Sequence, residues 1–226
     1  MIAASSPAGG RVWRRLPNLI EIALVVVIAV ALGRLSNHDS SAPKPGAVDI
    51  GFSQDMAVHH EQAVLMADLA LTRGGSAVAS LANAILIDQS QEVGMMRGWL
   101  KLWNSSTVDP APMSWMPQVP KMSMPPMMLM SGPVPLSGTR TMPGMATPEQ
   151  LTRLSTLSGK RFDVLFLQLM IRHHQGGLVM CQYAQADAKL AIVRKAATAM
   201  AVEQIEDLGQ MQAILKADGG NPLPQP

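Results

Sequence analysis

Apolar residues recur at helical spacing over two long stretches of the chain. From about residue 49 to 73, one helical stripe is formed, at alternating spacings of four and three, by Phe52, Met56, His59, Ala63, Met66 and Ala70. Arg73 and the two glycines after it end this helix, and Ser76 can cap a second helix from about 77 to 103. The pattern predicts a first helical hairpin over residues 49–104.

A second helical hairpin is predicted over residues 148–218. Thr147 is expected as the N-cap, Pro148 as the first helical residue and Gln150 as the partner in a capping box. Helices then follow from about 161 to 186 and from about 188 to 216. One hairpin alone leaves its apolar stripe uncovered, so the two are expected to pair as an all-α four-helix bundle. Residues 219–226 are expected to form a disordered tail.

The two hairpins share a motif that is repeated at an offset of 114 residues. Residues 52–66 read FSQDMAVHHEQAVLM, and residues 166–180 read FLQLMIRHHQGGLVM. Further on, Gln89 and Glu92 are matched by Gln204 and Asp207 at an offset of 115. These polar residues are expected to hydrogen-bond between helices or to hold the N–H groups of the histidines.

An apolar run near the N-terminus predicts export. Residues 1–15 form a basic N-terminal tail, and residues 16–35 contain LPNLIEIALVVVIAVALG, which as a helix would span roughly 27 Å, close to the thickness of a bilayer core. Arg11, Arg14 and Arg15 precede this run and Arg34 follows it, which predicts a cytoplasmic N-terminus. The segment is either a transmembrane anchor or a cleavable signal, because Ala29–Ala31 resembles a cleavage site.

Both interpretations put the rest of the chain outside the cytoplasm. The anchor gives a single-pass protein of the cell membrane, and cleavage gives a secreted or periplasmic one. Residues 36–48 are polar and contain proline, so they read as a linker.

Residues 105–147 differ from the rest of the chain. They hold nine prolines and nine methionines, with Asp109, Lys121 and Arg140 as the only charged residues. Proline recurs too often for a helix or a central strand, so this Met/Pro-rich connection is predicted to be irregular. It could gather copper, form an adhesive or membrane-lying patch, or serve only as a linker.

The composition restricts the classes of partner. Only 15% of residues are charged, the formal net charge is +2 and aromatic residues make up 4%, so no nucleic-acid surface is expected. Cys181 is the one cysteine, which excludes an intramolecular disulfide, and it is expected to be a small buried residue rather than a ligand. Methionine is abundant, with 18 residues, whereas four of the five histidines lie in the repeated motif.

The repeated motif joins soft sulfur to imidazole on one helical turn. Met56 neighbours His59 and His60, and by the same spacing Met170 neighbours His173 and His174. Thioether sulfur selects Cu(I), and imidazole accepts copper in either oxidation state, whereas zinc, calcium and magnesium prefer other donors. The histidine pairs are therefore predicted to bind metal. Whether they form one site or two depends on how the hairpins dock.

Core packing is the competing explanation for the methionines. A methionine at helical spacing is more often core filler than ligand, and this reading is preferred for Met66, Met96, Met180 and Met211.

The chain resembles the bacterial domain-of-unknown-function 305 family over roughly residues 48–217. The resemblance is carried by the two His-His segments and by DQSQEVGMMRGWL and MPGMATPEQLTRLSTLSGKRFD. It implies a ferritin-like four-helix bundle, export, and a relation to periplasmic copper-binding proteins. The metal ligands that it implies are Met56, His59, His60, Met66, Met96, Met170, His173, His174, Met180 and Met211. Two departures are Gly177 in place of Ala63 and Asp207 in place of Glu92.

The sequence thus predicts an extracytoplasmic copper-binding protein, with Cu(I) preferred to Cu(II), for sequestration, tolerance or handover. It is not expected to be an enzyme, because a di-iron bundle would need Glu-x-x-His motifs and none occurs. Expected partners are a metal ion and, through the N-terminal helix, the membrane; a homo-oligomer or a copper-handling partner is left open. The alternative is a non-metal helical interaction module anchored at the membrane surface.

Overall fold

The computed structural model describes residues 23–30, 43–116 and 142–226, which form six helices and no strand. The all-α prediction is confirmed for this part of the chain. The chain divides into two units, Met1–Ala42 and Pro43–Pro226. Of the first unit only residues 23–30 are described, as a helix. Across the described ranges, no helix is both long and apolar enough to cross a bilayer, and most of the predicted anchor, residues 16–35, lies outside them.

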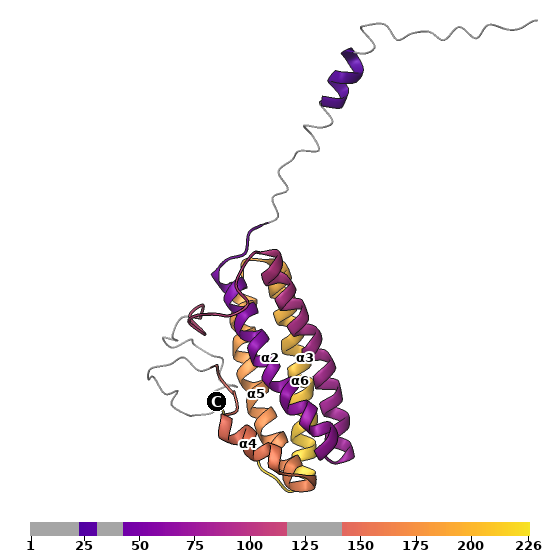
Figure 1. Cartoon of the computed structure of the whole chain (residues 1–226), viewed down its shortest axis with the longest axis vertical. Helices are drawn as coiled ribbons and strands as arrows, with labels where there is room; N and C mark the ends of the chain where they lie inside the picture. The colour runs from indigo at the N-terminus through magenta and orange to yellow at the C-terminus, as the bar shows by residue number, and fades with distance from the viewer. Residues whose placement is uncertain (1–22, 31–42, 117–141) are drawn as a thin grey trace, which may run out of the picture. The chain divides into compact units, whose positions relative to one another are not determined.

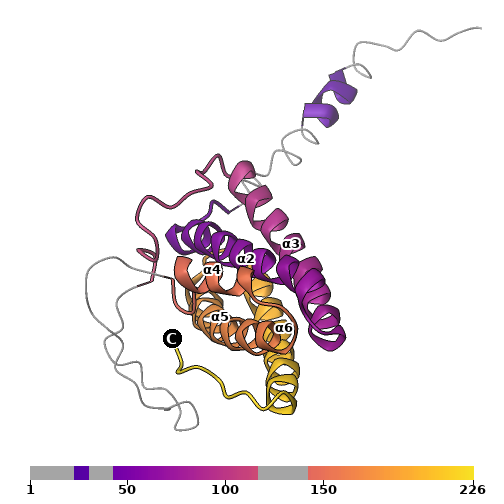
Figure 2. The same ribbon diagram turned by 60° about the horizontal axis from the view of Figure 1, so that its bottom comes forward.

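The second unit is built from four long helices and one short one (Figure 1). They are α2 (Ala47–Arg73), α3 (Ser76–Leu102), α4 (Pro148–Thr156), α5 (Gly159–Asp187) and α6 (Ala191–Ala217). Helix α2 packs on α3 and α5 on α6, and the two hairpins meet through α2 with α5 and α3 with α6 (Figure 2). The two helical hairpins predicted from the apolar stripes are therefore present.

The predicted helix ends agree with the structure within a few residues. At α4 the Thr147 hydroxyl accepts from the Gln150 amide and the Gln150 side chain accepts from the Thr147 amide, so the predicted capping box is confirmed. The prediction that Ser76 caps α3 is wrong, because Gly75 is the N-cap and Ser76 the first helical residue. An aspartate from another helix supplies the acceptor there.

Two buried aspartates clip the hairpins together in a symmetric way. Asp163, near the start of α5, accepts hydrogen bonds from the Gly75 amide at the start of α3, at 3.0 and 3.2 Å. Asp49, in the first turn of α2, accepts from the amides of Lys189 and Leu190 at the start of α6, at 3.2 and 2.9 Å. Each hairpin thus supplies a hydrogen-bond acceptor for backbone N–H groups that have no partner within the helix, at the start of a helix in the other hairpin.

The apolar core forms two clusters, one towards each end of the bundle. Cluster A contains the C-terminal half of α2 and the N-terminal half of α5, with Phe162, Phe166, Met66, Met170 and Met211 among its members. Cluster B contains the opposite halves, with Phe52, Met56, Met96, Met180 and Met200. The stripe predicted for α2 is confirmed, since all six of its residues are fully buried. The histidines lie between the two clusters along both α2 and α5.

Both described ends of the Met/Pro-rich connection pack against the bundle without forming a helix. At the first end, the Met113 amide and the Trp115 indole Nε1 donate to the Asp55 carboxylate, at 2.6 and 2.7 Å. At the second end, Gln62 of α2 exchanges two hydrogen bonds with the backbone of Ala146. Residues 117–141 lie outside the described ranges.

The C-terminal tail has no helix but makes contacts instead of being free. Gln168 Nε2 donates to the Asn221 carbonyl at 2.7 Å. The Leu223 side chain packs against cluster A. The prediction of a disordered tail did not anticipate that Leu223 packs on the bundle.

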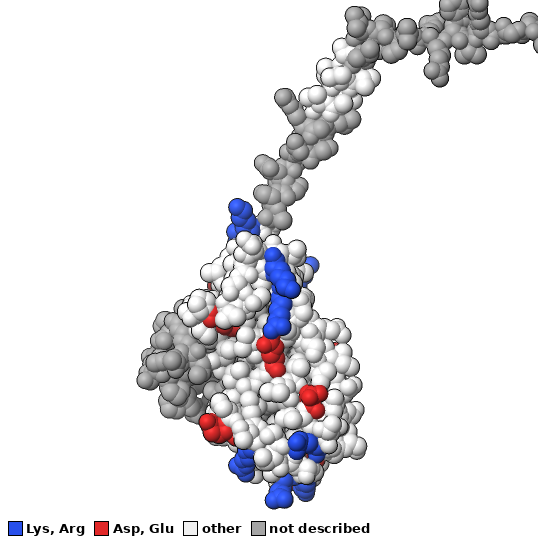
Figure 3. All heavy atoms as spheres, in the orientation of Figure 1, with Lys and Arg blue, Asp and Glu red and all other residues white. Residues whose placement is uncertain are grey.

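Charged side chains are scattered and sparse on the surface of the bundle seen in Figure 3, and both signs occur on that face. This agrees with the low charged fraction of the sequence.

We expect the reciprocal aspartate clips to carry measurable stability. Replacing Asp163 by Ala leaves the Gly75 amide without its acceptor, and a hydrogen bond to a charged group is worth about 1.5–3 kcal/mol. The free energy of unfolding, measured with urea, should fall by about that amount for Asp163→Ala and also for Asp49→Ala. The matched control is Asp68→Ala, at an exposed position of α2, which should change it by less than about 0.5 kcal/mol. Equal stability of all three variants would contradict the clips.

Candidate metal centre

The two histidine pairs meet in one layer at the middle of the bundle. His59 and His60 come from α2 and His173 and His174 from α5, and each side chain is at most 1% exposed. The His59 and His173 rings stack with centroids 3.7 Å apart and planes inclined by 31°. Within each pair the ring centroids are 6.1 and 6.3 Å apart. The structure thus brings the two pairs to one place, which the sequence left open.

The stacked pair is held by backbone carbonyl groups. His173 Nε2 lies 3.0 Å from the carbonyl oxygen of His59, on the facing helix. His59 Nε2 lies 3.1 Å from the carbonyl oxygen of Pro143. A carbonyl oxygen can only accept, so both rings carry their proton on Nε2.

The outer pair is held by the carboxylates that the repeat predicts. His174 Nε2 lies 3.2 Å from Asp207 Oδ2 of α6. His60 Nε2 lies 2.8 Å from Glu92 Oε2 of α3, at an ion-pair distance although without the alignment of a hydrogen bond. The predicted hydrogen bond to an imidazole is confirmed for Asp207, whereas Glu92 lies beside His60 without one, so the two hairpins have an acid at equivalent points. A carboxylate oxygen accepts, so His174 also presents Nε2–H to its partner.

One nitrogen of each imidazole is left without a partner. In all four rings Nδ1 is buried and makes no hydrogen bond. With the proton on Nε2, each Nδ1 has a bare lone pair that points into the protein interior. An unsatisfied buried polar atom costs about 1–3 kcal/mol, so four of them cost an amount comparable with the ~5–15 kcal/mol stability of a whole domain. A histidine that binds a metal typically donates one ring N–H to a carbonyl or carboxylate and offers its other nitrogen to the ion, and the rings of this layer resemble that pattern.

Burial keeps three of these imidazoles uncharged. Loss of hydration lowers the pKa of His59 and of His60 to about 3, with repulsion from neighbouring imidazoles as the smaller cause. The same causes lower the pKa of His173 well below its ordinary value. These rings are therefore neutral, ligand-competent bases at any pH near neutrality.

The six methionines predicted as ligands lie in the two core clusters on either side of the histidine layer. Cluster B holds Met56, Met96 and Met180, and cluster A holds Met66, Met170 and Met211, each fully buried. Of these six, each cluster takes one from α2, one from α5 and one from α3 or α6. Their burial agrees with core packing and also leaves thioether sulfur on both sides of the imidazoles.

Cys181 is a small buried residue, as the sequence analysis expects. Its side chain is fully buried, and its sulfur lies 4.0 Å from Gln204 Nε2. Burial raises the pKa of the thiol far above its ordinary value, so no thiolate ligand forms at neutral pH.

The glycines that replace Gln62 and Ala63 in the second copy, Gly176 and Gly177, have packing causes. A Cβ atom on Gly177 would lie 2.4 Å from Gln204 Oε1, so glycine leaves room for that side chain. A Cβ atom on Gly176 would lie 2.0 Å from the carbonyl oxygen of Pro143, so glycine lets the chain after the connection cross α5. The same crossing brings Pro143 to His59. Sequence analysis missed this contact, although the change from Gln62-Ala63 to Gly176-Gly177 was a signal for it.

The donors of the layer do not form a closed cage. Among the described residues, no three side chains of His, Cys, Asp or Glu are gathered as a set that could hold an ion. A soft ion that takes imidazole together with thioether does not need such a set. Imidazole with thioether is not the donor set of a zinc or calcium site.

The family model described as "Domain of unknown function (DUF305)" matches residues 49–215. A search of curated proteins gave no match. Among solved structures, a putative secreted DUF305 protein from Streptomyces coelicolor is 33% identical with a TM-score of 0.65, covering 78% of this chain and 95% of its own. A DUF305 fragment from Deinococcus radiodurans is 27% identical with a TM-score of 0.60, covering 77% and 99%.

A third similar structure is CopM in the Cu(I)-bound form, 22% identical with a TM-score of 0.53, covering 75% of this chain and 96% of its own. CopM is also known in Cu(II)-bound and Ag-bound forms. At this level of identity the likeness concerns the fold alone. The family model covers most of the chain and confirms the resemblance seen in the sequence: the protein belongs to the DUF305 family.

Proposed function

We propose that this protein binds copper through its histidine layer, with Cu(I) preferred to Cu(II). The observation that carries the proposal is the set of four buried imidazoles whose Nδ1 atoms have no partner. Two of the imidazoles of His59, His60, His173 and His174 would hold an ion through these nitrogens, together with thioether sulfur. Copper bound there would be shielded from water, which suits sequestration or controlled handover.

The surroundings of the layer support the same ion. Thioether groups from both core clusters flank the imidazoles, and soft sulfur selects Cu(I) among the biological metals. The Nε2 partners fix the orientation of each ring and increase its basicity. The likeness to CopM, known in Cu(I)-, Cu(II)- and Ag-bound forms, supports the proposal from outside this chain.

The cellular setting is a part of the proposal that rests on sequence. We infer that residues 16–35 export the chain and anchor it in the membrane, or are cleaved, so that the bundle works outside the cytoplasm. The Met/Pro-rich connection is proposed to gather Cu(I) by sulfur exchange. We assign no catalytic step, and we keep the ferritin-like relation of the bundle as a further proposal.

Replacing the four histidines tests the site directly. We expect the variant with His59, His60, His173 and His174 all changed to Ala to bind Cu(I) at least about 100-fold more weakly. Mutating a residue that only holds a ligating histidine in place typically costs about 10–100-fold in metal affinity, so losing the ligands themselves should cost more. Binding is measured by competition with a Cu(I) chelator and repeated with Ag(I). The matched control is His38→Ala in the linker, which removes the one remaining histidine and should bind as the native chain does.

A variant that keeps the histidines separates the layer from the connection. Replacing residues 117–141 by a Gly/Ser linker of equal length keeps both packed ends of the connection and removes five methionines. The number of Cu(I) ions bound should fall while the tightest binding remains. If this variant loses all binding and the four-alanine variant binds normally, copper belongs to the connection. If neither the native chain nor any variant binds tightly, the protein is an interaction module.

The buried imidazoles also predict how the metal-free protein responds to acid. A histidine whose pKa is about 3 in the fold and 6.5 in the unfolded chain binds its proton only on unfolding, so it destabilises the fold as pH drops from 6.5 towards 3. Loss of hydration, together with repulsion from neighbouring acids, raises the pKa of Glu92 and of Glu203 to about 7. These two groups act in the opposite direction, but only down to their ordinary value of 4.5.

The steepest loss of stability is therefore expected between pH 4.5 and 3, where only the histidine contribution remains. Each unit of pKa difference corresponds to about 1.4 kcal/mol for each histidine. Urea unfolding at several pH values measures this, and the four-alanine variant should lose much less stability in the same interval. An identical pH dependence in the two proteins would show that the imidazoles are not held neutral by the fold.

A further inference from the structure

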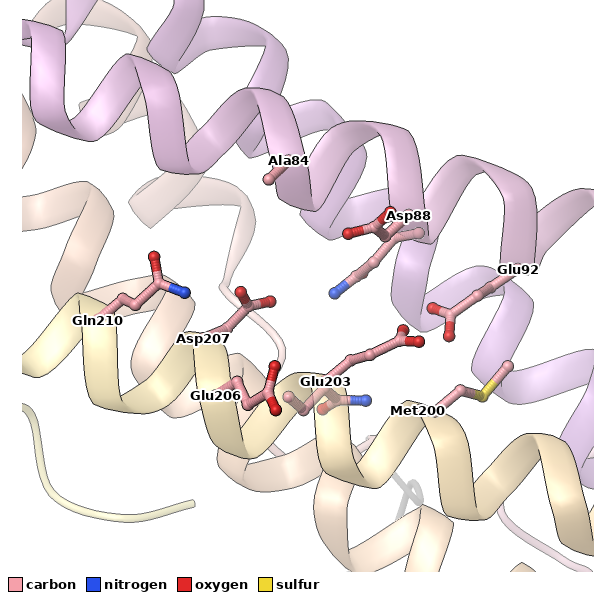
Figure 4. Close-up of a pocket in the computed structure, with 10 residues that line it drawn as sticks. Ala84, Asp88, Glu92, Met200, Glu203, Glu206, Asp207 and Gln210 are labelled. Atoms are coloured by element: carbon pink, nitrogen blue, oxygen red, sulfur yellow. The ribbon is translucent and has the colours of Figure 1, made fainter.

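A groove lined by carboxylates runs between α3 and α6, on the outer side of the histidine layer. Its volume is about 180 Å³, and its lining includes Asp88 and Glu92 from α3 and Glu203, Glu206 and Asp207 from α6. Figure 4 shows these side chains directed into the space between the two helices. Glu92 and Asp207 form its inner wall and touch His60 and His174, whereas Asp88, Glu203 and Glu206 are exposed.

The groove concentrates negative charge that no basic residue balances. None of the residues that line it is Lys or Arg. Like charges that face one another across a narrow groove repel, and the low local dielectric constant strengthens the repulsion. A bound cation would remove this repulsion.

An uncharged oxygen donor in the same groove is also without a partner. Gln89 lines the groove, its side chain is only 4% exposed, and its Oε1 atom is buried without a hydrogen bond. Its counterpart in the repeat, Gln204, has an Nε2 contact with Cys181. A buried amide oxygen that the protein leaves unsatisfied beside carboxylates suits a hard cation, which takes carboxylate and amide oxygens together.

We propose that this groove is a second cation site, which takes a divalent ion that prefers oxygen ligands, such as Mn²⁺. The Gln89 amide oxygen and the carboxylates of Asp88 and Glu203 would bind it, together with water. The site is separate from the soft histidine layer, because Glu92 and Asp207 lie between the two and contact the histidines. It does not depend on copper binding by the layer.

The ion in this groove keeps part of its water shell. Among the described side chains, three His, Cys, Asp or Glu residues do not come together as a closed set of ligands. The groove has room for several water molecules, since one water occupies about 30 Å³ in the liquid. Ions such as Mg²⁺ commonly bind proteins through one or two carboxylates and several waters, so a closed cage is not required.

Titration of the full chain with Mn²⁺, followed by the electron paramagnetic resonance signal of free Mn²⁺, tests the site. The test variant is Asp88→Asn with Glu203→Gln, which leaves Glu92, Asp207 and the histidines unchanged. The control variant is Asp68→Asn with Asp187→Asn, which removes the same charge at exposed positions outside the groove. We expect Mn²⁺ binding to weaken at least tenfold in the test variant and to change less than twofold in the control.

Two further readouts keep the result specific. Ag(I) binding should be equal in the native chain and in both variants, because the oxygen site and the soft site use different ligands. Circular dichroism should show both variants folded, and the test variant should melt at a higher temperature without metal because repulsion is relieved. The proposal is overturned if the native chain shows no saturable Mn²⁺ binding below 1 mM, roughly the weak end of protein sites for divalent ions. Equal loss in both variants, or no loss in the test variant, overturns it too.

Discussion

The main constraint on this bundle is that it buries four imidazoles, each of which is hydrogen-bonded through Nε2 at most. Each Nε2 lies near a carbonyl or carboxylate oxygen, and each Nδ1 meets no polar partner. Apolar side chains at these positions would make a more stable core, because a buried unsatisfied nitrogen is costly whereas a well-packed methyl group is not. The two core clusters and the aspartate clips supply the stability that tolerates this layer.

The duplication explains both the symmetry of the site and where the symmetry fails. Two like hairpins docked antiparallel bring His59 onto His173, and they bring Glu92 and Asp207 to equivalent rings. The chain that joins the hairpins is present only once, so it breaks the symmetry. It crosses α5 at Gly176, where the Pro143 carbonyl accepts from His59. His173 instead donates to a carbonyl of α2, that of His59. The two stacked imidazoles thus have the same chemistry with different supports.

The structure separates soft from hard donors within a short distance. Imidazole and thioether groups occupy the dry interior, and carboxylates line the groove between α3 and α6. Glu92 and Asp207 belong to both regions, since each lines the groove and touches a buried ring. Ions that differ in ligand preference would therefore be sorted by depth in the same bundle.

The sequence by itself determined the helices, the duplication and the identity of the candidate ligands. Helical periodicity is a local property, and the matched Met-x2-His-His motifs with their acids at constant offset are visible without a structure. Only the tertiary structure decided that the pairs form one layer, that the aspartates at 49 and 163 cap the opposite hairpin, and that Pro143 reaches His59. These contacts join residues that lie 84 to 141 positions apart, so they depend on how two stripes dock rather than on either stripe. The acidic groove escaped sequence analysis for the same reason: Asp88 and Glu203 are ordinary surface acids until α3 and α6 lie side by side.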